Sequence, residues 1–276
     1  MSDPTIAPPA GPGPVCASEG WGVLHLFFHL RREALLDPAA AAKDFVDRVT
    51  GFDTAQDQQV LAFSVVGQKA DLGLMVLSPD LAALDSFATA IAASPLGAAL
   101  LPAGSYLSLT ELSEYTPAAD DESKRLEEAE GLAAGSPEHG TAMAAFQERQ
   151  RAYAEHRLHP RLPLKKVISF YPMSKRRQGQ DNWYALPFEE RRRLMGGHAS
   201  VGRTYAGRVL QLITGSVGLD DWEWGVTLLA DDPKAIRDIV YEMRFDEVSA
   251  RYGEFGQFAT GLLMEPSVLV SHLGLV

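Results

Sequence analysis

The sequence has very little cysteine, no long apolar run and no excess of basic residues. Its only cysteine is Cys16, so the chain can form neither an internal disulfide framework nor a cysteine metal cluster, which is typical of a reducing cytoplasm. It has no apolar run of roughly eighteen residues and no basic region followed by an apolar core at the N-terminus. We therefore expect a cytoplasmic protein without a membrane span.

The charge balance is acidic rather than basic. The formal net charge is −11 over 276 residues, which argues against nucleic acid as a partner and favours plain solubility. A chain of this length has enough residues to bury a core, either in one large domain or in two small ones.

The chain divides into four segments by composition and pattern. Residues 1–20 are rich in proline and glycine and poor in large apolar residues, which predicts a flexible N-terminal arm. Residues 120–164 are charged and rich in alanine and glutamate, which predicts a helical connector with surface helices at 121–134 and 141–155. Between and after these segments lie two ordered halves, residues 21–119 and 165–276.

The two ordered halves show the same order of elements. In the first half the pattern predicts strand, helix, strand, strand, helix, strand at residues 21–30, 38–49, 58–66, 71–77, 81–93 and 105–115. In the second half it predicts the same order at residues 166–171, 187–201, 208–214, 222–229, 232–243 and 254–264. This β-α-β-β-α-β order is the ferredoxin-like plan, and its recurrence favours a duplication.

A histidine stands on an otherwise apolar helix face in the second half. Leu194, Met195, His198 and Val201 recur at three- and four-residue spacing, so they share one face. An inward imidazole needs a hydrogen-bond partner or stays neutral, and neutral imidazole is a common metal ligand. A core histidine bonded to a backbone carbonyl is the simpler alternative.

Polar side chains also lie among apolar ones on two predicted strands, and Gln211 is either a surface residue or a polar group in an apolar pocket. Gln211 lies between Val209 and Ile213 on one strand face, while Tyr171, Met173 and Lys175 share a face if the strand continues past Pro172. A phenol, a thioether and an ammonium side by side suit a site that binds an anion and performs redox chemistry. A strand end with a lysine reaching to solvent is the alternative.

These residues belong to blocks that together resemble the chlorite dismutase-like haem proteins, and within them the coproheme decarboxylases. The matching blocks are YPMSKRR (171–177), NWYALPFEERRRLM (182–195), His198, GRTYAGRV (202–209), Gln211, ITGSVGLDDWEWGVTL (213–228) and EMRFDEVSARYGEFG (242–256). The similarity is dense from about residue 165 to 258 and weaker through the N-terminal half. Blocks in the correct order are a more specific signal than one short motif.

The resemblance implies both a fold and a reaction. The fold is α+β, with duplicated ferredoxin-like βαββαβ repeats packed as a dimeric α+β barrel within one chain. The reaction is the peroxide-dependent decarboxylation of two propionates of iron coproporphyrin III (coproheme), which gives haem b. Coproheme is then both the substrate and the redox centre, and hydrogen peroxide is the oxidant.

The resemblance also assigns roles to individual residues. His198 matches the proximal iron ligand, and Gln211 the distal position, where genuine chlorite dismutases carry arginine. Tyr171 matches the catalytic tyrosine that relays oxidation to a propionate, and Lys175 the lysine that holds the second propionate. The remaining matched positions line the site or contact propionates: Arg157, Met173, Trp183 and Ser249.

The resemblance further implies a homopentamer that receives coproheme from a ferrochelatase. Two alternatives stay open: a chlorite dismutase-like enzyme that acts as a weak peroxidase, and a non-enzymatic haem carrier or sensor. Asp246 or Glu247 could orient the His198 imidazole, or could simply face solvent at a helix end. His25 and His29 lack a carboxylate companion in the sequence pattern, so we do not expect a metal site there.

Overall fold

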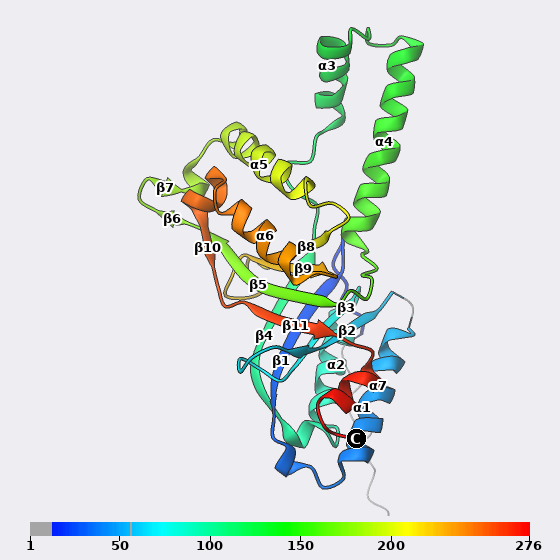
Figure 1. Ribbon diagram of the computed structural model, residues 1–276. Helices are drawn as coiled ribbons and strands as arrows, with labels where there is room; N and C mark the ends of the chain where they lie inside the picture. Colours follow the sequence, from blue (N-terminus) through cyan, green and yellow to red (C-terminus); the bar gives the residue numbers. More distant parts are fainter. Residues whose placement is uncertain (1–12, 56) are drawn as a thin grey trace, which may run out of the picture.

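The computed structural model describes residues 13–55 and 57–276. A large sheet forms the centre of the molecule, helices cover its outside, and a helical hairpin extends away from it (Figure 1). Within the described residues, no helix is long and apolar enough to cross a membrane.

The N-terminal half follows the predicted order of elements. It contains β1 (Gly22–Leu30), α1 (Pro38–Asp53), β2 (Gln59–Val65), β3 (Leu72–Ser78), α2 (Leu81–Ala92) and β4 (Leu100–Thr110). Asp37 and Asp80 begin the two helices, because each carboxylate accepts a hydrogen bond from a backbone N–H of the first turn. The predicted strand at 105–115 is wrong in its bounds, since β4 starts earlier and ends at Thr110.

The C-terminal half repeats this order. It contains β5 (Val167–Lys175), α5 (Phe188–Arg203), β8 (Val209–Gly215), β9 (Trp224–Ala230), α6 (Pro233–Met243), β10 (Gly253–Phe255) and β11 (Ala259–Leu263). Short elements complete it: β6 (Arg177–Gln178), β7 (Asp181–Asn182), η3 (Trp183–Ala185), η4 (Val248–Tyr252) and α7 (Pro266–His272). The spatial order β11-β5-β9-β8 matches the order β4-β1-β3-β2 of the first half, strand for strand. This correspondence confirms the duplicated ferredoxin-like fold.

Pairing between the halves closes the sheet on itself. β11 pairs with β2 and β4 pairs with β8, while β5 and β9 join within the second half. Apolar side chains from both halves fill the interior of this barrel, including Val23, Phe27, Phe63, Met75, Tyr106, Ile168, Phe170 and Leu229. The two repeats therefore share one interior core.

The predicted last strand, residues 254–264, is interrupted in the structure. β10 and β11 are separated by a connection in which Gly256 donates its N–H to the carbonyl of Pro172. A Cβ atom at Gly256 would lie 2.7 Å from Cγ of Pro172, so glycine allows this close crossing. In an extended strand the N–H and the carbonyl of one residue point to the same side. The position of the missing N–H of Pro172 is therefore on the side of the β10–β11 connection, so the proline removes no hydrogen bond between β5 and its neighbouring strand.

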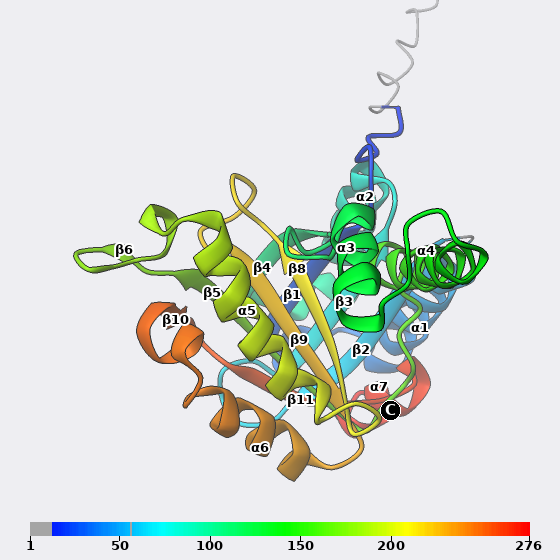
Figure 2. The ribbon, with the colours of Figure 1, turned by 90° about the horizontal axis from the view of Figure 1, so that it is seen from above.

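Helices cover the two halves of the sheet on its outer side (Figures 1 and 2). α1, α2 and α7 pack on the N-terminal half through an apolar cluster that includes Phe45, Leu72, Leu74, Leu84 and Leu269. α6 packs on the C-terminal half, and α5 lies across it beside α6. The outer face of the C-terminal half carries the polar residues that the sequence analysis identified.

The predicted connector forms the helical hairpin. It consists of α3 (Ala119–Glu130) and α4 (Pro137–Leu158), joined at Gly131, which ends α3 with a positive φ of 69°. Arg192 of α5 pairs with Asp121 of α3 at 2.8 Å. The last turn of α4 returns to the sheet and delivers Arg157 to the junction of β4 and β8.

Part of the predicted N-terminal arm attaches to the body. The Asp80 carboxylate accepts the N–H of Val15 at 2.7 Å, and Cys16 forms a β-bridge with Asp80. The rest of the arm, up to residue 12, lies outside the described residues.

Candidate functional site

Strand register places the candidate residues in rows on the outer face of the C-terminal half. Tyr171, Val226 and Ile213 form one row across β5, β9 and β8. Met173, Trp224 and Gly215 form the next row. Because side chains alternate along a strand, Gln211 shares this face with Ile213. The prediction that Tyr171 and Met173 share a face is confirmed, because β5 runs on to Lys175.

His198 lies on α5 and is held by a carboxylate. Its Nδ1 lies 3.0 Å from Oδ2 of Asp246, and the His198 side chain is about a quarter exposed. The helix presents Leu194 inward on the same face, as the spacing predicts. With Nδ1 engaged, Nε2 is the nitrogen left for a metal ion, and such an imidazole–carboxylate pair orients metal-binding histidines.

Asp246 itself is fixed by the backbone of η4. Its Oδ1 accepts N–H groups from Val248 at 2.9 Å and Ser249 at 3.2 Å. Burial opposes ionisation, but the hydrogen bonds from His198 and Ser249 outweigh it and lower the pKa of this carboxyl. Asp246 therefore stays charged beside the imidazole, and the alternative of a solvent-facing helix end is excluded for it.

Gln211 lies against α5, one turn beyond His198. Its Nε2 is 3.5 Å from the carbonyl oxygen of Gly202. A Cβ atom added at Gly202 would lie 3.3 Å both from Nε2 of Gln211 and from Cε of Met243. The glycine therefore lets the helix approach the glutamine closely.

Tyr171 is buried among aromatic rings. Its ring stacks on Phe258 at a centroid distance of 4.2 Å and lies 6.0 Å from Phe255. Burial raises the pKa of the phenol to about 12, although the nearby Arg244 guanidinium opposes this shift. Tyr171 is therefore a neutral phenol over the whole physiological pH range.

Lys175 is a buried cation packed on an indole ring. Its Nζ lies 4.8 Å from the centroid of Trp183, and the residue is only 7% exposed. Burial lowers the pKa of the ammonium to about 8, while the charges of Asp246 and Glu223 oppose this shift. Glu223 also accepts the Lys175 backbone N–H at 2.7 Å.

Trp183 connects this cation to η4. It packs in a cluster with Leu194 of α5 and with Val248 and Tyr252 of η4. Ser249 lies in the same short element. The structure thus places Lys175, Trp183 and Ser249 around one end of the face, beside the His198–Asp246 pair.

Arg157 lies at the other side of the face, where the β4–β8 ladder ends. Its Nη2 donates to the carbonyl oxygens of Ile213 at 3.1 Å and Glu111 at 3.5 Å. Its Nε is buried and has no hydrogen-bond partner. A buried unpaired N–H of a cation is costly, so this position is suited to an anionic ligand.

The sequence analysis missed Glu111, which lies next to Arg157. Its Oε1 accepts the indole N–H of Trp224 at 3.0 Å. In sequence it follows a strand whose apolar pattern gives no reason to select it. Only the pairing of β4 with β8 brings it to this face.

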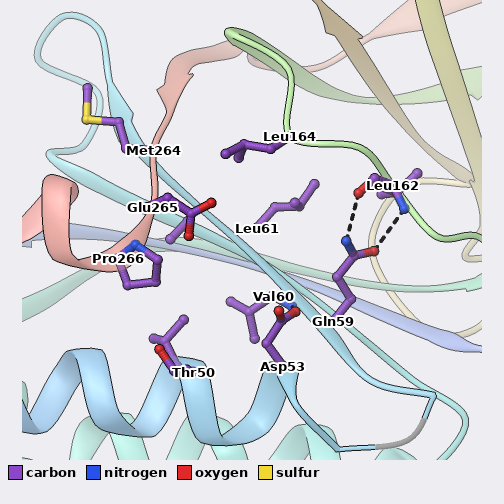
Figure 3. A pocket seen from close by; sticks show the side chains of 12 residues that line it. Thr50, Asp53, Gln59, Val60, Leu61, Leu162, Leu164, Met264, Glu265 and Pro266 are labelled. Atoms are coloured by element: carbon purple, nitrogen blue, oxygen red, sulfur yellow. Dashed lines mark hydrogen bonds between the residues drawn. The ribbon is translucent and has the colours of Figure 1, made fainter.

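Two cavities are lined by neither His198, Lys175 nor Arg157. One, of about 160 Å³, lies between α1, β2 and the start of α7 (Figure 3). Its polar groups are engaged structurally, because Gln59 bonds both the N–H and the carbonyl of Leu162, and Asp53 accepts the Val60 N–H. A larger one, of about 380 Å³, lies between α6 and the β5–β11 pair and is bordered by Phe258, the ring that stacks on Tyr171.

The described residues contain no cluster of three or more histidine, cysteine or carboxylate side chains that could hold a metal ion by themselves. His25, one of the two histidines for which no metal site was expected, lies inside the barrel, where Nε2 contacts Thr227 at 3.1 Å. His198 would therefore need an iron whose other ligands come from outside the chain.

Comparisons with known proteins agree with this fold. The chlorite dismutase family model matches residues 37–264. A solved haem-binding protein from Thermus thermophilus is 39% identical, with a TM-score of 0.75 over 93% of this chain and 96% of that chain. A variant of the chlorite dismutase from Candidatus Nitrospira defluvii is 15% identical, with a TM-score of 0.69 over 93% and 96% of the two chains.

Proposed function

The chain belongs to the chlorite dismutase family, and we propose that it is a coproheme decarboxylase. In this proposal an iron porphyrin binds between α5 and the outer face of the C-terminal half. Two propionates of coproheme lose carbon dioxide and become vinyl groups, which gives haem b. Hydrogen peroxide is the oxidant, and the reaction is the last step of coproporphyrin-dependent haem biosynthesis.

The residues present fit an iron porphyrin in three respects. His198 offers one imidazole nitrogen and is oriented by Asp246 at 3.0 Å. Arg157 has a buried Nε without a partner, as expected of a group that meets an anionic ligand. The 39% identical relative from Thermus thermophilus is described as haem-binding. When bound, the iron would supply the reaction with peroxide.

Each decarboxylation removes carbon dioxide, one proton and a pair of electrons from a propionate, and one peroxide molecule accepts the electron pair as it becomes water. In this proposal Tyr171 is the residue that oxidises the propionate. A neutral phenol can give up an electron and a proton together, and burial keeps the pKa of Tyr171 at about 12. The phenoxyl radical would then take a hydrogen atom, which is one proton and one electron, from the propionate. Loss of carbon dioxide from the resulting carbon radical would release the second electron, which the remaining oxidising equivalent of the peroxide would accept.

In this proposal two cations on the face hold the propionates. Lys175 is buried against Trp183 near one end of the face, and Arg157 stands at the β4–β8 junction. An ammonium and a guanidinium in low-dielectric surroundings bind carboxylates strongly. Ser249 adds a hydroxyl beside Asp246, and Met173 lies two residues after Tyr171 on the same face of β5.

The presence of a buried Tyr171 and a buried Lys175 on one strand, β5, carries this proposal. A haem carrier or sensor needs an axial histidine, but it does not need a buried phenol and a buried ammonium on the adjoining strand. The uncharged Gln211 argues against chlorite turnover, because the family's chlorite-degrading members carry arginine at that position. A weak peroxidase remains the second candidate.

The test is to load the protein anaerobically with ferric coproporphyrin III, titrate it with hydrogen peroxide, and analyse the porphyrin by mass spectrometry. We expect stepwise loss of two carboxyl groups through a monovinyl intermediate. An unchanged porphyrin, or bleaching alone, would contradict the decarboxylase and favour a carrier or peroxidase.

The Tyr171→Phe variant tests the proposed relay. We predict that it binds coproheme normally but forms product at least about 100-fold more slowly, since phenylalanine cannot supply a hydrogen-abstracting radical. Tyr205→Phe is the matched control, because Tyr205 belongs to the same outer cluster while its hydroxyl is bonded to Glu242. Normal turnover by Tyr171→Phe would refute the radical assignment.

The family resemblance also supports a homopentamer, a cytoplasmic location and transfer of coproheme from a ferrochelatase. Sedimentation equilibrium tests the first of these directly. A mass of five chains of 30.0 kDa each is expected, and a monomer at micromolar concentration would contradict it.

A further inference from the structure

Glu111 is a half-buried carboxylate on the proposed porphyrin-binding face with no role in the function proposed above. Leu109 and Thr110 pair with Gly215 and Thr214 in an antiparallel ladder. Continuing this register sets Glu111 opposite Ile213, on the outer side of the sheet. The carboxylate thus lies on the same face as Gln211 and Trp224.

Two contacts fix the position of this carboxylate. The indole of Trp224 donates to Oε1 at 3.0 Å. A Cβ atom at Gly215 would lie 2.1 Å from Oε2, so the carboxylate occupies the space that any larger residue would fill. Since Trp224 and Gly215 are themselves cross-strand partners, the carboxylate rests on one defined row of the sheet.

Arg157 is the cation beside this carboxylate. Its Nη2 is used by the carbonyls of Ile213 and Glu111, but its buried Nε has no partner. A carboxylate of the ligand is a suitable partner for Nε. Its arrival would bring two carboxylates to a single guanidinium, and like charges at such a site cannot both stay ionised without a large loss of affinity.

We propose that Glu111 is a positioning residue that takes up a proton when a ligand carboxylate binds at Arg157. This inference rests on the proposed function, because it takes a porphyrin propionate as the ligand, and it adds a proton to the binding step. In the free protein the ionised Glu111 balances the charge of Arg157. In the complex the ligand carboxylate replaces it as the counter-ion.

The surroundings of Glu111 suit such a role. Burial raises the pKa of its carboxyl, while the Trp224 hydrogen bond and the Arg157 charge oppose the shift and Glu114 adds to it. Arg157 from α4 and Glu114 from the same loop are the charged groups that act on it, and Arg191 of α5 pairs with Glu114 at 3.7 Å. β8 and β9 present the uncharged Gly215 and Trp224.

The test measures binding of metal-free coproporphyrin III by fluorescence between pH 5 and 7, where Lys175 with its pKa of about 8 keeps its charge. We expect wild-type affinity to fall with rising pH, by up to about tenfold per unit where one proton is taken up. Glu111→Gln should bind tightly at pH 7 with a flatter profile. Calorimetry in two buffers should show that Glu111→Gln takes up fewer protons on binding than the wild-type protein does.

The matched control is Glu114→Gln, which removes a more exposed carboxylate of the same loop. It should keep the wild-type pH slope. Trp224→Phe provides a second measurement, because loss of the indole hydrogen bond should move the fall in affinity to higher pH. Arg157→Ala should bind weakly at every pH.

The outcomes separate this inference from the function. If the affinity of Glu111→Gln has the wild-type pH slope, or is lower at all pH values, Glu111 does not couple proton uptake to ligand binding. That result leaves the proposed decarboxylation unaffected. If the wild-type protein binds neither metal-free nor ferric coproporphyrin III, both proposals are overturned.

Discussion

Lys175 is a cation in a place where charges are rarely buried. It is 7% exposed and lies over the Trp183 ring, with Asp246 and Glu223 as the nearby negative charges. Burial disfavours its charged form, so the residue is ready to lose its proton unless an anion arrives. A carboxylate ligand would therefore stabilise the charged form of Lys175 that burial disfavours.

We predict that the contribution of Lys175 to carboxylate binding is lost as pH rises through about 8. Burial lowers the pKa of its ammonium from 10.5 to about 8, so the charge is present below that value and absent above it. Lys175→Met should weaken ferric coproporphyrin III binding at pH 7 and abolish the loss between pH 7 and 9. Lys165→Met, which removes a surface partner of Asp231, should leave that pH profile unchanged.

The same shift has a consequence for stability. Between about pH 8 and 10.5 the unfolded chain holds the Lys175 proton while the folded chain does not. The folded state therefore gains stability relative to Lys175→Met as pH rises through this window. Urea unfolding of both proteins at pH 8 and 10 checks the sign, and an opposite trend would contradict the burial argument.

His25 is a second buried titratable residue, inside the barrel. It is fully buried, stacks on Phe170 at 4.0 Å, and has one ring nitrogen without a partner. Burial lowers the pKa of the imidazole to about 3. The folded protein therefore holds this ring neutral, whereas the unfolded chain protonates it below about pH 6.5.

We predict that His25 makes the protein less stable in acid. From pH 6.5 down to about 3 the unfolded state binds the additional proton, so the free energy of unfolding falls by up to about 1.4 kcal/mol per pH unit from this group. His25→Phe should retain the ring packing and show a shallower loss between pH 6.5 and 5 in urea titrations. An unchanged slope would mean that the imidazole is hydrated in the folded protein.

At the scale of elements, α5 has to combine a stable helix with a close approach to the sheet. It contains Gly196 and Gly197 just before His198, and Gly202 one turn after it. A Cβ atom at Gly196 would meet nothing within 4 Å, whereas one at Gly202 would meet Gln211 and Met243 at 3.3 Å. Replacing these two glycines of the same helix should therefore have different effects on the protein.

We predict opposite outcomes for alanine at these two positions. Gly196→Ala should raise the free energy of unfolding by about 1 kcal/mol, because alanine favours the helix and nothing is displaced. Gly202→Ala should gain less, because the new methyl group crowds Gln211, and it should change the visible spectrum of the bound iron porphyrin. Equal spectra for the two variants would show that the methyl group at position 202 does not displace Gln211.

The ends of elements were predictable where local chemistry determines them. Asp80 and Asp232 cap helices, as expected of an aspartate at a helix start, and the repeated order of strands and helices is confirmed. The break between β10 and β11 was not, because it depends on Gly256 crossing Pro172, a residue 84 positions earlier in the chain. Alternation within a strand cannot reveal such a crossing.

Much of the candidate site could also be read from the sequence, with the help of family resemblance. The inward face of α5 and the shared face of β5 follow from spacing alone. Glu111 could not be found in this way, since its position depends on the pairing of strands from different halves. The partner of His198 stayed open for the same reason, because Asp246 reaches it from 48 residues away.

At the scale of the whole molecule, the interior core belongs to both repeats. Phe27 and Phe63 of the first half pack with Phe170 and Ile168 of the second. Removing either half would expose this surface on the other. The halves resemble independent domains in sequence, but they have only one barrel interior between them.

We therefore predict a single cooperative unfolding transition. Tryptophan fluorescence reports on Trp21 in the first half and on Trp183, Trp222 and Trp224 in the second. The transition that it follows in urea should coincide with that seen by far-UV circular dichroism. A truncated chain that ends at residue 164 should fail to fold. Two separate transitions would show that the halves are stable on their own.

Closure of the sheet is uneven, and this affects how the protein can associate with other chains. β10 is three residues long with Glu254 at its centre, and a short, charged edge is a poor template for strand addition. β4, in contrast, pairs with β8 only at Leu109 and Thr110, so residues 100–108 have β1 on one side and no described strand of the large sheet on the other. The backbone of β4 is therefore the place where a second chain could add a strand.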